Sequence, residues 1–181
     1  RIFKSSKYLE GNYEDDKRAI VEKYNQSGYR DAYIVSDSVY VIDDKNIGIA
    51  INVEEGNKYY FRNINWVGNT KYDTATLNRV LGIHKGDVYN KELLQTNLTY
   101  NEGGYDVSAI YMDDGYLFFS VDPVEVRADN DSIDLEIRIY EGDQAKIGKV
   151  SVKGNTKTND HVVIREMYTK PGQLFSRSDV I

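Results

Sequence analysis

The sequence predicts an α+β protein built from tandem copies of one small module, in the order strand, helix, helix, strand, strand. Two observations carry this prediction. The segment Phe61–Lys71 recurs 86 positions later as Ile147–Lys157. A stripe of apolar residues at every second position in residues 47–53 recurs in residues 133–139 with the same spacing. Self-similarity at one fixed spacing is typical of repeat proteins, so the copies are expected to fold alike.

The two stripes define a strand that is buried on one face. Polar or small residues separate the apolar ones, which is the pattern of a sheet with one face packed against other elements and the other face exposed to solvent. We therefore expect a three-stranded mixed sheet covered on one face by two helices, with these strands at the centre of matching modules. The apolar positions are Ile47, Ile49, Ile51 and Val53, and then Ile133, Leu135, Ile137 and Ile139.

Helix start and stop signals lie between the strands. Asp73 is a candidate N-cap for a short helix that Gly82 ends. A second helical region begins near Asn90, is interrupted at Gly103–Gly104 and resumes up to Gly115.

Two extended runs follow the helices, Leu117–Arg127 and Ser132–Tyr140, and the turn-forming residues between them indicate a hairpin. With this element order, the repeat divides the chain into three parts. We predict the C-terminal part of one module in residues 1–56, a complete module in 57–142 and the N-terminal part of another in 143–181.

Composition limits the possible functions. Of the 181 residues, 40% are hydrophobic and 29% are charged, which is enough apolar surface for a globular fold. The net charge is −6 and no Lys/Arg cluster occurs, so we expect no nucleic-acid partner. The chain has no cysteine, which excludes disulfides and thiolate metal sites. No apolar run approaches the roughly 18–20 residues that span a bilayer, and the start at Arg1 does not resemble a signal peptide, so we expect a mature or excised segment.

Candidate catalytic and metal-binding residues are few. His84 and His161 occupy non-equivalent places in the repeat and have no HExxH or triad context. The acidic run at residues 129–134 lacks the glycine that a calcium loop requires at its sixth position, which is Asp134. We expect a protein that is not an enzyme and that holds no cofactor and no metal.

Four short motifs recur in an order that resembles the POTRA repeat, and among POTRA proteins the BamA family of outer-membrane protein assembly factors. The motifs are Trp66–Thr70 at a strand end, Lys85–Gly86 in a turn, Asp114–Tyr116 at a helix exit and Tyr140–Gly142 in a linker. The resemblance covers essentially the whole chain. One departure is the break at residues 101–104, where a more continuous helix is expected.

The resemblance implies a location and partners that the periodicity alone does not give. It implies a periplasmic arm of an outer-membrane protein, attached in the parent protein to a membrane β-barrel. It implies binding of unfolded outer-membrane proteins and of accessory assembly lipoproteins. A POTRA segment of a two-partner secretion transporter or of a cell-division protein is the alternative.

Pro123 indicates how binding could occur. Proline cannot donate a ladder hydrogen bond, so its strand is expected at a sheet edge, where an extended client could add as a further strand. The alternative is that proline protects the edge from such pairing. The predicted polypeptide-binding residues are Phe118, Phe119, Ser120, Val121, Asp122, Val124, Glu125 and Val126, with Phe118 or Phe119 lining the adjacent groove. The short links between copies predict hinges at Gly56, Asn57, Lys58, Gly142 and Asp143, and rigid packing of neighbouring modules is the alternative.

Overall fold

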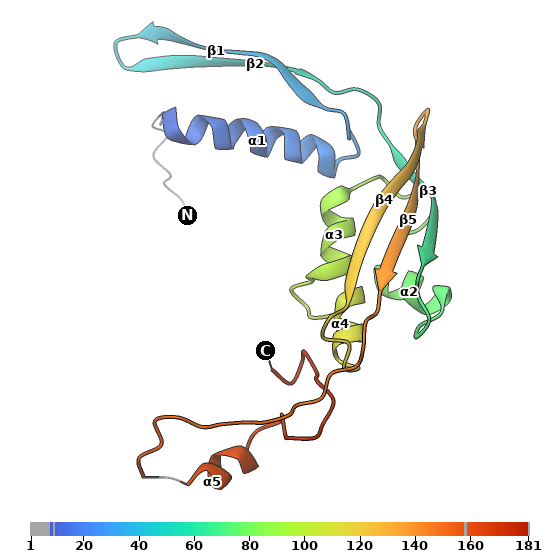
Figure 1. The fold of residues 1–181 in the computed structure, drawn as a ribbon. Coiled ribbons are helices and arrows are strands. Elements are labelled where there is room, and N and C mark those ends of the chain that lie inside the picture. The colour runs from blue at the N-terminus through green and yellow to red at the C-terminus, as the bar shows by residue number, and fades with distance from the viewer. Residues whose placement is uncertain (1–7, 9, 158, 181) are drawn as a thin grey trace.

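The chain curves as an arc with the complete module (residues 57–142) in its middle (Figure 1). The computed structural model describes residue 8, residues 10–157 and residues 159–180. One end of the arc holds α1 (Glu10–Gln26) and a hairpin of β1 (Tyr33–Asp43) and β2 (Asn46–Glu54). The other end holds the segment with α5 (Asp160–Arg165). No helix within the described ranges is long and apolar enough to cross a membrane.

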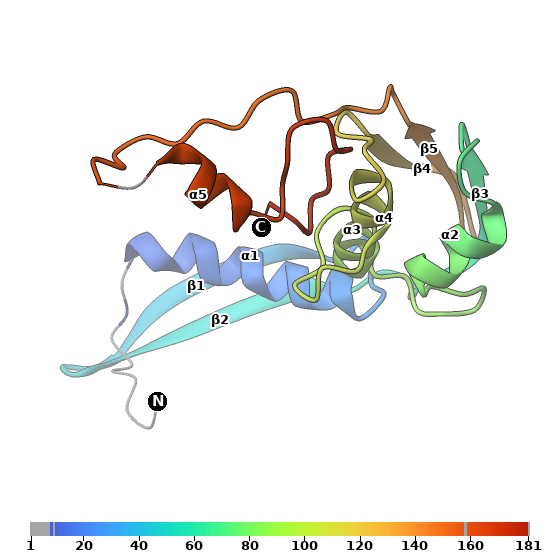
Figure 2. The same ribbon diagram turned by 90° about the horizontal axis from the view of Figure 1, so that it is seen from below.

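The complete module is a three-stranded mixed sheet with helices on one face (Figure 2). The strand order is β3-β5-β4, where β3 is parallel and β4 antiparallel to β5. The predicted fold class is therefore confirmed. The module's elements are β3 (Tyr60–Val67), α2 (Thr74–Leu81), α3 (Lys91–Thr99), α4 (Val107–Met112), β4 (Ser120–Asp129) and β5 (Ser132–Tyr140).

The helices of the complete module begin where the sequence predicts. The Asp73 carboxylate accepts from the Thr76 N–H at 2.8 Å, and the Asn90 side-chain oxygen accepts from the Leu93 N–H at 2.9 Å. Gly82 ends α2 with a φ of 64°, a left-handed conformation that glycine adopts without strain. The glycine break divides the predicted second helix into α3 and α4.

The core lies between β5 and the helices. Ile133, Leu135, Ile137 and Ile139 are at most 8% exposed, and the residues between them are half-buried or exposed. Leu77, Leu81, Leu98 and Tyr111 of the helices are fully buried against this stripe. Each such side chain contributes on the order of 1.5–3 kcal/mol, so the alternation fixes which face of the sheet the helices cover.

Among the described residues the flanking copies show only part of the module's elements, and two expectations about their strands are wrong. β2 was expected at the centre of a sheet, but among the described residues it pairs with β1 alone, and Ile47 and Ile49 are 40% and 45% exposed. Residues 147–152 form no strand, because the described residues hold no partner strand for them. One antiparallel bridge remains there, Lys146 to Leu174, which repeats the Tyr60 to Val88 bridge of the complete module.

Candidate polypeptide-binding groove

β4 is an edge strand. Among the described residues it pairs with β5 on one side and with no strand on the other. Pro123 lies opposite Ile137 in this pair, so the proline stands in an edge strand as its missing N–H predicts. In general, the unpaired side of an edge strand is where another chain can add as a further strand.

A groove of about 420 Å³ runs between β4 and α3. Its apolar part consists of Leu94 from α3, Pro123 and Val124 from β4 and Leu135 from β5, and its polar part consists of Arg30, Tyr89, Lys91, Gln95 and Glu125. A second pocket of about 700 Å³ adjoins it at five shared residues and extends to Glu22, Asn25 and Gln26 on α1. The groove therefore continues from the complete module onto the preceding copy.

Glu125 is the carboxylate of this groove and is held from two sides. The Arg30 guanidinium lies 2.6 Å from its Oε2, and the Tyr89 hydroxyl donates to its Oε1. Burial, assisted by this bond, raises the pKa of Tyr89 above its ordinary value. Arg30 also lies over the Tyr59 ring, 5.8 Å from its centroid, and pairs with Asp31. These contacts fix a side chain of the preceding copy against the edge strand.

The predicted binding residues divide into three groups. Ser120, Val121, Asp122, Val124, Glu125 and Val126 lie on β4, although Val121 packs against the core. Phe119 was expected near the groove, but it is 6% exposed and stacks on Tyr111 with centroids 4.3 Å apart, because the turn before β4 directs it into the core. Phe118 is 66% exposed and precedes β4, and it does not line the groove either.

The sequence prediction missed the side of the groove opposite β4. Tyr89, Lys91, Leu94 and Gln95 come from α3 and the residue pair before it, and Arg30 comes from the preceding copy. One signal for Lys91 was available, because the repeat spacing of 86 places Arg177, also basic, at the equivalent position.

The predicted hinge residues Gly56, Asn57, Lys58, Gly142 and Asp143 lie in two linkers that other contacts bridge. At the first joint, where residues 24–31 meet residues 57–92, the Tyr59 N–H donates to the Gly28 carbonyl at 2.9 Å. At the second joint, where residues 106–117 meet residues 143–178, the Ala145 N–H donates to the Gly115 carbonyl at 2.8 Å. The two joints thus have a backbone hydrogen bond at equivalent positions of the repeat. Pivoting at the linkers stays a prediction.

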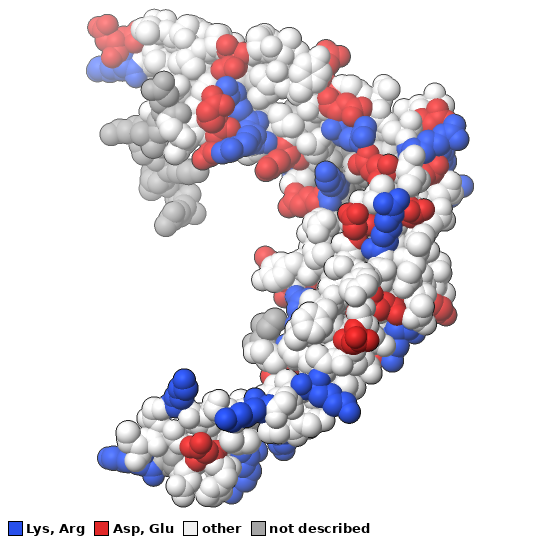
Figure 3. Space-filling view, in the orientation of Figure 1, with Lys and Arg blue, Asp and Glu red and all other residues white. Residues whose placement is uncertain are grey.

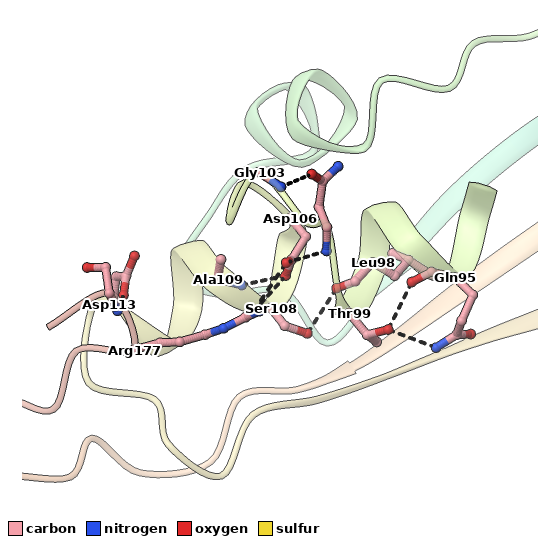
Figure 4. Close-up of polar contacts among 11 residues, drawn as sticks. Gln95, Leu98, Thr99, Gly103, Asp106, Ser108, Ala109, Asp113 and Arg177 are labelled. Carbon is pink, nitrogen blue, oxygen red and sulfur yellow. Dashed lines mark hydrogen bonds and ion pairs between the residues drawn. The ribbon is translucent and has the colours of Figure 1, made fainter. Parts of the chain in front are cut away.

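The second joint contains a buried ion pair (Figure 4). Asp106 is the N-cap of α4, has no exposed surface and accepts from the backbone N–H groups of Ala109 and Asn101 at 2.8 and 3.1 Å. Arg177, from the following copy, places Nη1 at 3.3 and 3.2 Å from its two carboxylate oxygens. The break between α3 and α4 creates this cap, so the departure from a continuous helix gives the second joint its anchor.

Charged side chains of both signs surround the edge strand. On the face shown in Figure 3, acidic and basic residues are interspersed over the complete module and the first hairpin, whereas the segment with α5 shows mainly Lys and Arg. No single sign of charge therefore dominates the surface near β4, which suits recognition through backbone hydrogen bonds.

Comparison with known proteins decides the family. The chain matches the POTRA family, described as a surface antigen variable number repeat, over residues 1–56, 59–142 and 145–181. The chain belongs to the POTRA family. Each of its three copies is thus matched separately, and the resemblance inferred from the recurring motifs is confirmed.

Relatives of this POTRA chain include BamA proteins. Outer membrane protein assembly factor BamA of Neorickettsia risticii is 24% identical over 99% of the chain, and that of Nitratidesulfovibrio vulgaris is 29% identical over 90%. The chain spans 24% and 20% of their lengths. The crystal structure of POTRA3-5 of Haemophilus influenzae BamA matches with a TM-score of 0.67 and 23% identity, covering 98% of this chain and 69% of that one. The structural match establishes the fold.

Proposed function

We propose that the complete module binds extended polypeptide segments by strand addition to β4, as part of a periplasmic scaffold for outer-membrane protein assembly. The observation that carries the proposal is the single neighbour of β4 among the described residues. An edge strand presents backbone N–H and C=O groups that bond an added strand largely regardless of its sequence. A receptor for many unfolded β-proteins requires this tolerance.

The groove beside β4 supports the proposal. An added strand turns alternate side chains toward the helices, and Leu94, Val124 and Leu135 offer them apolar contact. The setting is supported by the relatives, which are named as outer membrane protein assembly factors. The proposed clients are unfolded outer-membrane proteins, the proposed partners include accessory assembly lipoproteins, and the parent protein is proposed to carry a membrane β-barrel. The proposed role is binding and not catalysis.

A matched pair of variants on the two sheet edges tests the proposal. Val124 lies on β4 beside the groove, and Val67 lies on β3, the opposite edge of the same sheet. A charge at position 124 faces an incoming strand, so Val124→Asp should weaken binding of a fluorescein-labelled peptide of alternating valine and serine by about tenfold, or ~1.4 kcal/mol. Val67→Asp should leave binding within about twofold, as read by fluorescence anisotropy.

The same experiment can reject the proposal. Equal affinity of both variants and the unchanged chain, with circular dichroism showing both variants folded, would mean that β4 is not the contact. Loss of binding in Val67→Asp alone would assign the contact to β3 instead.

A further inference from the structure

The two joints share a tyrosine pair at equivalent repeat positions, so the residues of one joint can be matched to those of the other. Tyr24 and Tyr29 form an edge-to-face pair with centroids 5.9 Å apart at the first joint. Tyr111 and Tyr116, 87 positions later, form the same pair at 5.9 Å at the second. The helix ends at the two joints therefore carry the same tyrosine pair at equivalent positions of the repeat.

The contacts across the joints follow the same register. At the first joint Gln26 bonds to two residues of the next copy: its backbone carbonyl accepts from the Asn90 side chain, and its amide donates to Glu92. At the second joint the equivalent residue is Asp113, whose carboxylate accepts from the Ser176 hydroxyl at 3.2 Å and from the Ser178 N–H at 2.7 Å. At the first joint the contacted residues, Asn90 and Glu92, stand on either side of Lys91. At the second joint, Ser176 and Ser178 stand on either side of Arg177.

That basic residue has a carboxylate partner at one joint and none at the other. Arg177 pairs with the buried Asp106. Lys91, its equivalent 86 positions earlier, has no hydrogen bond or ion pair with the residues that the structure describes. The position equivalent to Asp106, 87 residues earlier, is Ala19, which supplies no carboxylate. At the first joint the described part of the chain thus provides the cation but no carboxylate that pairs with it.

Lys91 lies on the wall of the groove beside β4. The other cation of the groove, Arg30, is already paired with Glu125 at 2.6 Å. Glu92, in the adjoining pocket, is bonded to the Gln26 amide, and Glu22 lies on the α1 side of that pocket. Lys91 is therefore the cation of the groove that remains for a ligand.

We propose that Lys91 is a specificity-determining residue of the groove and binds the carboxylate of an Asp or Glu side chain in the extended segment added to β4. The inference rests on the proposed function and extends it by naming the class of segment that binds. Such a segment places apolar side chains toward Leu94 and Leu135 and one acidic side chain at Lys91. The incoming acid occupies the role that Asp106 fills at the second joint. Backbone hydrogen bonds to β4 give the affinity, and the ion pair between Lys91 and the acidic side chain favours segments that carry an acid at that position.

The test compares peptides that differ in one charge. A fluorescein-labelled peptide of alternating valine and serine is prepared with aspartate in place of each valine in turn, because the valines face the groove that Lys91 lines, and matching peptides carry asparagine. At one position the aspartate peptide should bind the unchanged chain about threefold to fivefold more tightly than its asparagine counterpart, the range of a partly exposed ion pair. The preference should vanish in Lys91→Gln and decline with added salt.

Charge reversal and a matched control sharpen the result. Lys91→Glu should prefer a lysine peptide at that position, whereas Lys85→Gln, in an exposed turn outside the groove, should keep the aspartate preference. Equal binding of all aspartate and asparagine peptides, while Val124→Asp still weakens them, overturns the role of Lys91 and leaves strand addition intact. Binding that is indifferent to Val124→Asp overturns the proposed function itself.

Discussion

Replacing Arg177 by alanine tests the buried ion pair of the second joint. Asp106 has no exposed surface, and the Arg177 side chain is 15% exposed. The substitution therefore leaves a buried carboxylate without the one cation that pairs with it among the residues that the structure describes. Removing one partner of a fully buried pair costs about 3–5 kcal/mol. Asp106 keeps its two backbone donors, Ala109 and Asn101, which offset part of that loss. We expect a loss of about 2 kcal/mol, the size of a hydrogen bond to a charged group.

Urea unfolding measures this loss. Trp66, the single tryptophan, lies on β3 and donates its indole N–H to Asn78 at 2.8 Å, so its fluorescence reports the complete module. Arg165→Ala is the control, because its pair with Glu166 is more than 70% exposed on both sides and is worth at most about 1 kcal/mol. Asp106→Asn in the Arg177→Ala background should cost less than in the unchanged chain, with a coupling of about 1 kcal/mol or more. A midpoint of Arg177→Ala that matches that of Arg165→Ala would refute the reasoning.

Three further predictions concern the complete module. Glu141 accepts from the N–H groups of Thr70 and Lys71 at Oε1, at 2.7 and 2.8 Å, and from the Thr70 hydroxyl at Oε2. Glu141→Gln removes the charge and leaves a single acceptor oxygen for these three donors, so it should cost about 1–2 kcal/mol in urea unfolding while Glu136→Gln costs less. Hydrogen bonds from Arg62 lower the pKa of Asp134 from 3.8 to about 2. Because the folded state favours the ionised form, this stabilisation is complete above the ordinary pKa and is lost as pH falls through about 2; Asp134→Asn should flatten that part of the acid melting profile. A Cβ at Gly68 would lie 2.2 Å from the Ile139 carbonyl oxygen, whereas a Cβ at Gly154, which has the same φ of 89°, would meet open space. Gly68→Ala should therefore lower the melting temperature more than Gly154→Ala. Equal shifts of the melting temperature would contradict the steric argument.

The buried face of β5, the helix caps and the edge strand could be predicted because each depends on residues close together in sequence. The alternation of Ile133, Leu135, Ile137 and Ile139 predicts which face of the strand is buried, even when the helices that cover it are not known. Asp73 and Asn90 cap helices through bonds that span three residues. Pro123 marks an edge because its own backbone lacks a donor.

Only the tertiary structure decided which side chains form the groove and the joints. Asp106 and Arg177 are 71 positions apart, and neither residue alone indicates that the first is fully buried. Phe118 and Phe119 are adjacent and chemically identical, yet one is exposed and the other lies in the core, because the turn before β4 decides their directions. Lys91 and Arg177 share a repeat position, yet among the described residues only Arg177 has a carboxylate partner, because that partner, Asp106, is supplied by the preceding copy. Local pattern fixes the elements of this protein, whereas contacts between distant residues follow from how the copies are placed against one another.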